Sequence, residues 1–141
     1  MKHVHQNLSQ KDIAQLLREH GITPTKQRVI IAFLIFDKST HLSAEDIFRL
    51  VNADNRRVSK ATVYNTLGLL AEKGVVREVI ADPTRIFYDP NTQPHHHFFD
   101  VASGKLTDIS ADQIQVSGLP PLPSGSRLEG VDVIVRLRAD K

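Results

Sequence analysis

The spacing of apolar residues in the first half of the chain predicts four helices. Three of them follow a serine in the N-cap position, namely Ser9, Ser43 and Ser59. The other helix opens at Pro24–Thr25 and is apolar on most sides, so we expect it to lie at the centre of the core. The last helix, which Gly74 ends, has one apolar face, formed by Val63, Leu67, Leu70 and Ala71.

After Gly74 the pattern changes from helical to strand-like. Residues 75–80 and 85–88 predict two strands joined by a turn at 81–84. Helices followed by a hairpin in this order are typical of a winged helix-turn-helix. The next segment is rich in Asp, Asn and Pro and predicts a linker. We expect an α+β chain with three parts: a winged-helix domain at 1–89, a hinge at 90–94 and a small α/β dimerisation domain at 95–141.

The second domain has a hydrophobic pattern of its own. Residues 96–102, 105–109 and 131–137 predict strands, whereas 118–126 are too rich in Pro and Gly for a long helix. Three strands in fewer than about 50 residues are too small to be stable alone. We therefore expect a homodimer, possibly assembled further into a tetramer, which also suits a palindromic DNA site. The alternative is packing of this domain against its own winged domain.

The composition limits the cellular compartments and the kinds of metal site that we expect. Hydrophobic residues make up 40% and charged residues 24%, as in ordinary soluble proteins. No long apolar run predicts a membrane span or a secretory signal, so we expect a cytoplasmic protein. The absence of cysteine excludes disulfides and thiolate zinc sites. Residues 1–80 hold 12 Lys and Arg against 8 Asp and Glu, a basic balance that is compatible with nucleic acid.

The last predicted helix carries small and polar residues opposite its apolar face. Recognition helices read base edges with their N-terminal residues. The candidates for base or phosphate contact are Ser59, Lys60, Ala61, Thr62, Tyr64 and Asn65. Lys26 and Arg28, on the predicted core helix, are candidates for phosphate contact. A winged-helix module that binds another protein would show a similar pattern, with Tyr64 as a residue at the rim of the apolar face.

Three consecutive histidines, His95, His96 and His97, precede two phenylalanines. In a strand, His95 and His97 face one way and His96 the other, which gives half of a metal site. Imidazole also binds haem iron, so all three are candidate haem ligands. The alternative is a solvated turn after Pro94.

Further candidate ligands lie elsewhere in the chain. His41 precedes the third helix, Asp89 ends the hairpin and Asp108 lies near the end of the predicted strand at 105–109. Each has an ordinary structural alternative as a helix-start, turn or cap residue. If they converge with His95 and His97, the five residues form one site per protomer that bridges both domains. Their nitrogen and oxygen donors suit Fe²⁺, Mn²⁺ or Zn²⁺.

Several segments resemble the ferric uptake regulator family over nearly the full chain. They are Gly-Ile-Thr-Pro-Thr-Lys-Gln-Arg (21–28), His-Leu-Ser-Ala-Glu-Asp-Ile-Phe (41–48), Val-Ser-Lys-Ala-Thr-Val-Tyr-Asn-Thr-Leu (58–67), the histidine triplet and Ser-Gly-Lys (103–105). The resemblance implies a metal-dependent dimeric repressor. Its regulatory-site pattern falls on His41, Asp89, His95, His97 and Asp108. A shift by one residue would place Tyr88 in the position of Asp89.

The resemblance also assigns roles to single residues. Tyr64 matches the family's base-contacting tyrosine, whereas Asn65 replaces a frequent arginine, which leaves the operator preference open. Asp100 and Ser103 occupy the positions of a cysteine pair that binds structural zinc, so we expect no such site. A second metal site also looks lost, because Pro94 and Gln115 stand at ligand positions.

The histidine triplet, the lack of cysteine and the ending Val-Asp-Val-Ile-Val-Arg-Leu-Arg resemble the iron response regulator subgroup. This resemblance implies an iron- and haem-responsive regulator that haem inactivates on DNA. The alternative within the family is a repressor that senses peroxide or manganese. A metalloenzyme that uses the histidine cluster is a distant alternative, since the chain has no motif such as His-Glu-x-x-His. We therefore expect no enzyme activity.

Overall fold

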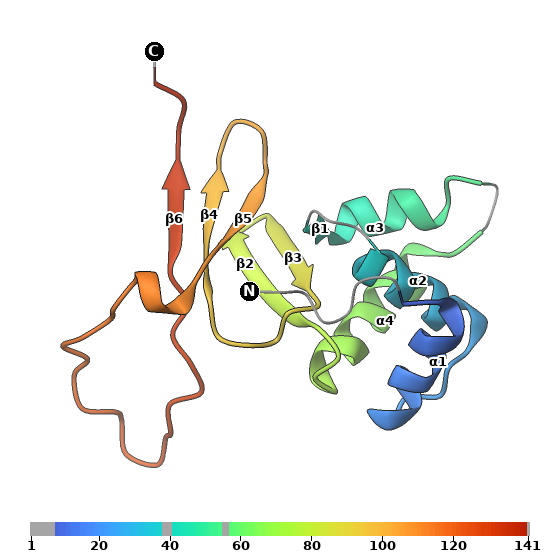
Figure 1. Cartoon of the computed structure of the whole chain (residues 1–141), viewed down its shortest axis with the longest axis horizontal. Helices are drawn as coiled ribbons and strands as arrows, with labels where there is room; N and C mark the ends of the chain where they lie inside the picture. The colour runs from blue at the N-terminus through green and yellow to red at the C-terminus, as the bar shows by residue number, and fades with distance from the viewer. Residues whose placement is uncertain (1–7, 38–40, 55–56, 141) are drawn as a thin grey trace. The chain divides into compact units, whose positions relative to one another are not determined.

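The computed structural model describes residues 8–37, 41–54 and 57–140 (Figure 1). The chain divides into two compact units, residues 2–92 and 93–141, which we describe separately. No helix in the described part of the chain is long and apolar enough to cross a membrane.

The first unit contains the four predicted helices. They are α1 (Gln10–Glu19), α2 (Lys26–Asp37), α3 (Ala44–Val51) and α4 (Lys60–Glu72). The predicted serine caps are confirmed, because Ser9, Ser43 and Ser59 each accept a hydrogen bond from a backbone N–H in the first turn. In α1 and α3 the side chain of an aspartate also accepts a hydrogen bond from the backbone N–H of the serine, which completes a capping box.

Helix α2 is the central core helix, as predicted. Its buried residues lie on several sides of the helix: Val29, Ile30, Ile31, Ala32, Ile35 and Phe36. The other three helices pack around it and bury one face each. In α4 the buried face includes Val63, Leu67 and Leu70, which leaves the opposite face of the helix exposed.

A three-stranded antiparallel sheet completes this unit. Strands β2 (Arg77–Asp82) and β3 (Arg85–Asp89) form the predicted hairpin, and β1 (Leu42–Ser43) pairs with the other edge of β3. The predicted strand began at Val75, but β2 begins two residues later. Val75 and Val76 do not belong to the strand. They are packed in the helical core, where they are only 4% and 2% exposed, and this burial accounts for their apolar side chains.

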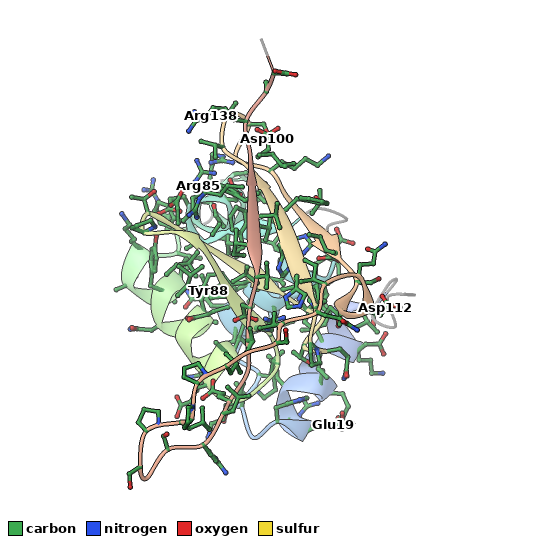
Figure 2. All side chains as sticks on the ribbon, turned by 90° about the vertical axis from the view of Figure 1, so that its left-hand side faces the viewer. Glu19, Arg85, Tyr88, Asp100, Asp112 and Arg138 are labelled. Atoms are coloured by element: carbon green, nitrogen blue, oxygen red, sulfur yellow. The ribbon has the colours of Figure 1, made fainter. Side chains whose placement is uncertain are left out.

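The second unit is built on another three-stranded sheet, with the strand order β5-β4-β6. Its strands are β4 (His96–Asp100), β5 (Leu106–Ile109) and β6 (Ile134–Leu137). Strand β4 runs antiparallel to β5 and parallel to β6. The only helix in the described part of this unit is the 3₁₀ turn Ala111–Gln113, and β6 is shorter than predicted. The intervening segment 114–133 has neither helix nor strand, and many of its side chains are exposed (Figure 2).

The capping box of α3 makes a testable contribution to stability. Burial raises the pKa of Asp46, but hydrogen bonds from the Ser43 backbone and from Arg49 outweigh it and lower the pKa below its usual value. A carboxylate with a depressed folded-state pKa stabilises the fold above its unfolded pKa of about 4. This contribution is lost as the pH falls through the folded-state pKa.

We expect Asp46→Asn to lower the free energy of unfolding by about 0.5–1 kcal/mol at neutral pH, the scale of a helix cap or terminal charge. The difference from wild type should shrink below pH about 4. Urea unfolding at both pH values measures it, with the exposed Asp140→Asn as control. A difference that is unchanged across this pH range would contradict the prediction.

Candidate functional site

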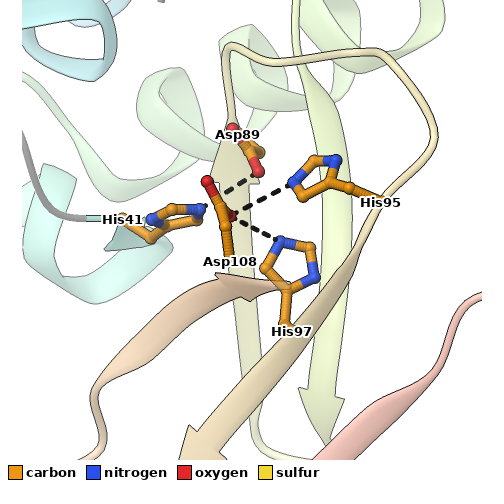
Figure 3. Close-up of side chains that lie close together, drawn as sticks. All are labelled: His41, Asp89, His95, His97 and Asp108. Atoms are coloured by element: carbon orange, nitrogen blue, oxygen red, sulfur yellow. Dashed lines mark hydrogen bonds and ion pairs between the residues drawn. The ribbon is translucent and has the colours of Figure 1, made fainter. Parts of the chain in front are cut away.

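Two of the three histidines meet one carboxylate inside the second unit. The β4–β5 register places His97 opposite Asp108. The Nε2 atoms of His95 and His97 lie 3.2 Å and 3.3 Å from Asp108 Oδ1, and their ring centroids are 4.5 Å apart (Figure 3). Both imidazoles are buried, and Asp108 is partly open to solvent. This His/Asp cluster thus gathers two nitrogen donors and one oxygen donor, with ligand atoms within 4.8 Å of one another.

The backbone sets which nitrogen of His95 faces the cluster. Its Nδ1 lies 2.7 Å from the carbonyl oxygen of Gln93, which can only accept, so Nδ1 carries a hydrogen. In the neutral ring Nε2 then points a lone pair at the Asp108 carboxylate. Two electron-rich atoms at this distance repel unless a proton or a cation lies between them. An imidazole whose other N–H is held by a carbonyl is also the usual form of a metal ligand, so the donor set fits a divalent ion.

A second pair of candidate ligands lies in the first unit. His41 Nε2 is 3.1 Å from Asp89 Oδ2 (Figure 3). His41 immediately precedes β1 and Asp89 ends β3, and the pairing of Leu42 with Tyr88 brings the two positions side by side. The other oxygen of Asp89 accepts a hydrogen bond from the backbone of Asn91 at 2.9 Å, which fixes the carboxylate in place.

The alternation of β3 separates Asp89 from Tyr88. Tyr88 packs in the hydrophobic core. Burial, together with the nearby charge of Glu78, raises the pKa of Tyr88 to about 12. It is Asp89, and not Tyr88, that lies beside His41. Of the two alternatives in the sequence, the geometry therefore favours Asp89.

His96 faces away from its two neighbours and makes a different contact. The backbone N–H of Val133 donates to His96 Nδ1 at 3.0 Å, and the backbone N–H of His97 donates to the Val133 carbonyl at 3.2 Å. His96 is thus engaged at the start of β6 and lies apart from the His/Asp cluster.

The positions where the family carries zinc-binding cysteines form a turn in this chain. Asp100 Oδ1 accepts hydrogen bonds from the backbone of Ala102 and Ser103, at 3.0 Å and 3.3 Å. Pro94 and Gln115, at the positions of the second family site, are exposed. With no cysteine in the chain, a thiolate zinc site has no ligands here.

Most of the candidate DNA-contacting residues at the start of α4 lie outside its buried face, whereas Tyr64 also packs partly against the core. Ser59, Lys60, Ala61 and Asn65 are exposed, and Thr62 and Tyr64 are half-buried. The Ser59 hydroxyl is committed to the helix end, since it accepts from the Thr62 backbone and donates to the Thr62 hydroxyl. Lys60 Nζ lies 5.9 Å from the centre of the Tyr64 ring, within the range of a cation–π contact.

On α2 the two cationic candidates differ. Lys26 is exposed, whereas Arg28 is half-buried and donates from Nη1 to the Thr23 carbonyl at 3.0 Å. Lys26 is therefore the more available of the two for a phosphate.

Two contacts around α3 were not predicted from the sequence. The Tyr64 hydroxyl donates to Glu45 Oε2 at 3.2 Å. Asn52, just after α3, donates from Nδ2 to the carbonyls of Phe48 and Val58 at 2.9 Å and 3.1 Å and accepts from the Val58 backbone at 2.8 Å. The position of an asparagine at the end of a helix was the available signal for Asn52. It joins the end of α3 to the residues that lead into α4.

Comparison with known proteins gives a consistent result. The profile of the ferric uptake regulator family matches residues 19–119. The peroxide-responsive repressor PerR of Staphylococcus aureus (strain Mu50) is 32% identical over 98 residues, which cover 70% of this chain and 66% of the repressor. The chain thus spans just under two thirds of the length of this curated relative.

Solved structures show the same fold. The ferric uptake regulator of Vibrio cholerae aligns with a TM-score of 0.70 and 18% identity, over 89% of this chain and 98% of that one. The ferric uptake regulator of Pseudomonas aeruginosa with manganese aligns with a TM-score of 0.65 and 22% identity, over 90% and 97% of the two chains. At these identities the likeness establishes the fold alone.

The contacts of Asn52 predict a stability effect. Asn52→Ala leaves partly buried backbone groups at Phe48 and Val58 without their partners, so we expect a loss of about 1–3 kcal/mol in the free energy of unfolding. Asn65→Ala is the control, because Asn65 is exposed on α4 and should change stability by less than about 0.5 kcal/mol. Urea unfolding measures both, and equal stability of the two variants would contradict the assigned role.

Proposed function

We propose, since the chain belongs to the ferric uptake regulator family, that it is a metal-responsive transcriptional regulator that binds operator DNA as a homodimer. The observation that carries this proposal is the approach of His95 and His97 to Asp108, in a chain whose helix α4 exposes a polar face. The peroxide-responsive repressor and the manganese-bound regulator among the similar proteins support regulation over the metalloenzyme alternative.

The proposed sensor is one metal site per protomer. His95, His97 and Asp108 would provide three ligands, and His41 and Asp89 the other two. Only residues 90–94 separate Asp89 from His95 in the sequence, so both groups can reach a common ion. A bound divalent ion supplies the positive charge that these carboxylates and imidazole lone pairs share. The all-nitrogen and oxygen donor set favours Mn²⁺, Fe²⁺ or Zn²⁺.

Regulation by haem is an alternative to regulation by a divalent metal alone. Its support is the gathering of His95, His96 and His97 beside Phe98 and Phe99, since imidazoles bind haem iron and aromatic rings pack on porphyrin. Each of these imidazoles already has a protein contact. Haem would therefore have to draw a histidine away from Asp108 or Val133. A response to manganese, or to peroxide as in the name of the similar repressor, needs no such displacement.

The proposed DNA contacts follow from exposure on α4 and α2. Lys60, Ala61, Tyr64 and Asn65 would face the major groove from the first turns of α4. Ser59 and Thr62 would mainly form the helix end, where a phosphate can approach the backbone N–H groups. Lys26 and Arg28 would neutralise phosphate.

The proposed dimer interface lies on the second unit. Most of the exposed large apolar side chains belong to this unit: Phe98, Val101, Val116, Leu119, Leu122, Leu128, Val131 and Leu137. A surface with this many apolar side chains is typical of an interface. A second copy of the chain is the partner that a two-fold operator requires.

Metal binding provides the first test. His97→Ala should reduce Mn²⁺ or Zn²⁺ affinity by more than about 10-fold, because loss of even an indirect ligand contact costs about 10- to 100-fold. His96→Ala, on the opposite face of β4, should change it little. Calorimetric titration of the metal-free protein measures both affinities.

His41→Ala is the decisive variant for the shared site. If five ligands hold one ion, His41→Ala should lower the metal affinity as much as His97→Ala does. Full affinity in His41→Ala would restrict the site to the second unit, and equal affinity in the His96 and His97 variants would contradict the assignment.

DNA binding by metal-free, Mn²⁺-loaded, Fe²⁺-loaded and haem-loaded protein tests regulation. We expect a divalent metal to raise affinity for a duplex selected from a random library by about 5- to 150-fold, the usual range of coupling between two sites. Under the haem alternative, haem lowers this affinity by a similar factor, and a variant with alanine at His95, His96 and His97 does not respond. Light scattering on the same samples should give a dimer.

Matched variants separate the two kinds of DNA contact. Lys26→Ala should weaken all duplexes alike and flatten the salt dependence, whereas Tyr64→Ala should cost about 1–3 kcal/mol on the selected duplex only. A monomer without duplex binding under any loading would overturn the proposed function.

A further inference from the structure

The hydrogen bond between Tyr64 and Glu45 joins two helices at the exposed face of α4. Tyr64 lies in the second turn of α4 and Glu45 in the first turn of α3. The Tyr64 hydroxyl is 3.2 Å from Glu45 Oε2, and the carboxylate is exposed. Strand β1, which pairs with β3, leads directly into α3 and so holds Glu45 in place.

A glutamate in the first turn of a helix has an ordinary explanation, since its charge favours the positive end of the helix dipole. That explanation requires no partner on another helix. Here the carboxylate reaches across to the tyrosine of α4, and Lys60 of the same helix lies over the tyrosine ring. The contact therefore orients the hydroxyl end of a half-buried side chain on the proposed DNA-binding surface.

The direction of this hydrogen bond determines what Tyr64 can recognise. A phenol has one O–H donor and oxygen lone pairs that accept, whereas an ionised carboxylate only accepts. The Tyr64 O–H therefore donates its hydrogen bond to Glu45, and the hydroxyl oxygen presents only lone pairs to a ligand. In the major groove, adenine N6 and cytosine N4 are the amino donors, while guanine and thymine present acceptors.

We propose that Glu45 is a specificity-determining positioning residue: it fixes the Tyr64 hydroxyl as a hydrogen-bond acceptor, so that Tyr64 selects adenine or cytosine at one operator position. This inference rests on the proposed function. Without Glu45 the hydroxyl rotates, and it donates to guanine or thymine as readily as it accepts from adenine or cytosine.

The protonation state of the tyrosine agrees with this geometry. Burial, and then the charge and the hydrogen bond of Glu45, raise the pKa of Tyr64 above its usual value. Tyr64 thus keeps its proton at neutral pH, as the donated hydrogen bond requires. The chain has two tyrosines and no tryptophan, so comparison with Tyr64→Phe identifies the tyrosinate absorbance that belongs to Tyr64.

The experiment compares base preference in full-length, Mn²⁺-loaded wild type, Glu45→Ala, Tyr64→Phe and the double variant. A duplex selected by the wild type from a random library is changed one base pair at a time, and the affinity for each duplex is measured. We expect one position where wild type prefers adenine or cytosine by about 5- to 150-fold, the range of one good base contact. Glu45→Ala and Tyr64→Phe should each lose this preference, and the double variant should lose no more than either.

A matched control and a second readout keep the result interpretable. Glu72→Ala removes an exposed acidic residue from the far end of α4 and should keep the preference. Ultraviolet titration of tyrosinate, without DNA, should show a lower Tyr64 pKa in Glu45→Ala than in wild type or Glu72→Ala, because the Glu45 carboxylate lies beside the Tyr64 hydroxyl.

The outcomes separate this inference from the proposed function. If wild type selects no duplex, the proposed function fails. If it selects one but Glu45→Ala keeps the full base preference, or Tyr64→Phe weakens every duplex equally, the role of Glu45 is wrong.

Discussion

The alternation of side chains along β4 is the constraint on which the His/Asp cluster of His95, His97 and Asp108 depends. Successive residues of a strand face opposite sides of the sheet, so three consecutive histidines cannot act as one group. His97 faces the side on which His95 and Asp108 lie, and His96 takes the N–H of Val133 near the start of β6. The triplet therefore makes two kinds of contact. His95 and His97 meet Asp108, whereas His96 binds the backbone of Val133 next to β6.

The first unit, which carries the β2–β3 hairpin and is called the winged unit below, depends on a similar division between faces. Burial of Val63, Leu67 and Leu70 fixes the rotation of α4 about its axis, and this rotation exposes Lys60 and Asn65. The core thus decides which residues a ligand can reach before any ligand is present. Asn52 helps to set the distance between the end of α3 and the start of α4, because its side chain donates hydrogen bonds to the carbonyls of Phe48 and Val58.

The sequence predicted the helices and strands that depend on residues close together in the chain. The serine caps, the apolar helix α2 and the wing hairpin each follow from residues close together in the chain. Features that depend on distant partners were missed. Strand β1 has two residues and exists only because β3 pairs with it. Val75 and Val76 looked like strand residues because a buried loop and a buried strand have the same apolar pattern.

The candidate site follows the same rule. Spacing in the sequence predicted that His95 and His97 share a face, and the pairing with Asp108 agrees with it. The tautomer of His95 could not be predicted, because it is set by the Gln93 carbonyl, and neither could the bond between Tyr64 and Glu45, which joins two helices. Hydrogen bonds between residues of different helices, strands or loops can be predicted only when the fold is known.

A short path joins the candidate metal ligands of the winged unit to its proposed DNA face. His41 immediately precedes β1, which continues through the cap Ser43 into α3, and the first turn of α3 carries Glu45. Glu45 in turn holds Tyr64. In the proposed regulator, a metal ion that fixes His41 against Asp89 also restrains the start of α3. Metal then raises DNA affinity only if the DNA-competent position of α3 is the one in which His41 binds the ion best, because a ligand shifts an equilibrium solely by its preference between two states.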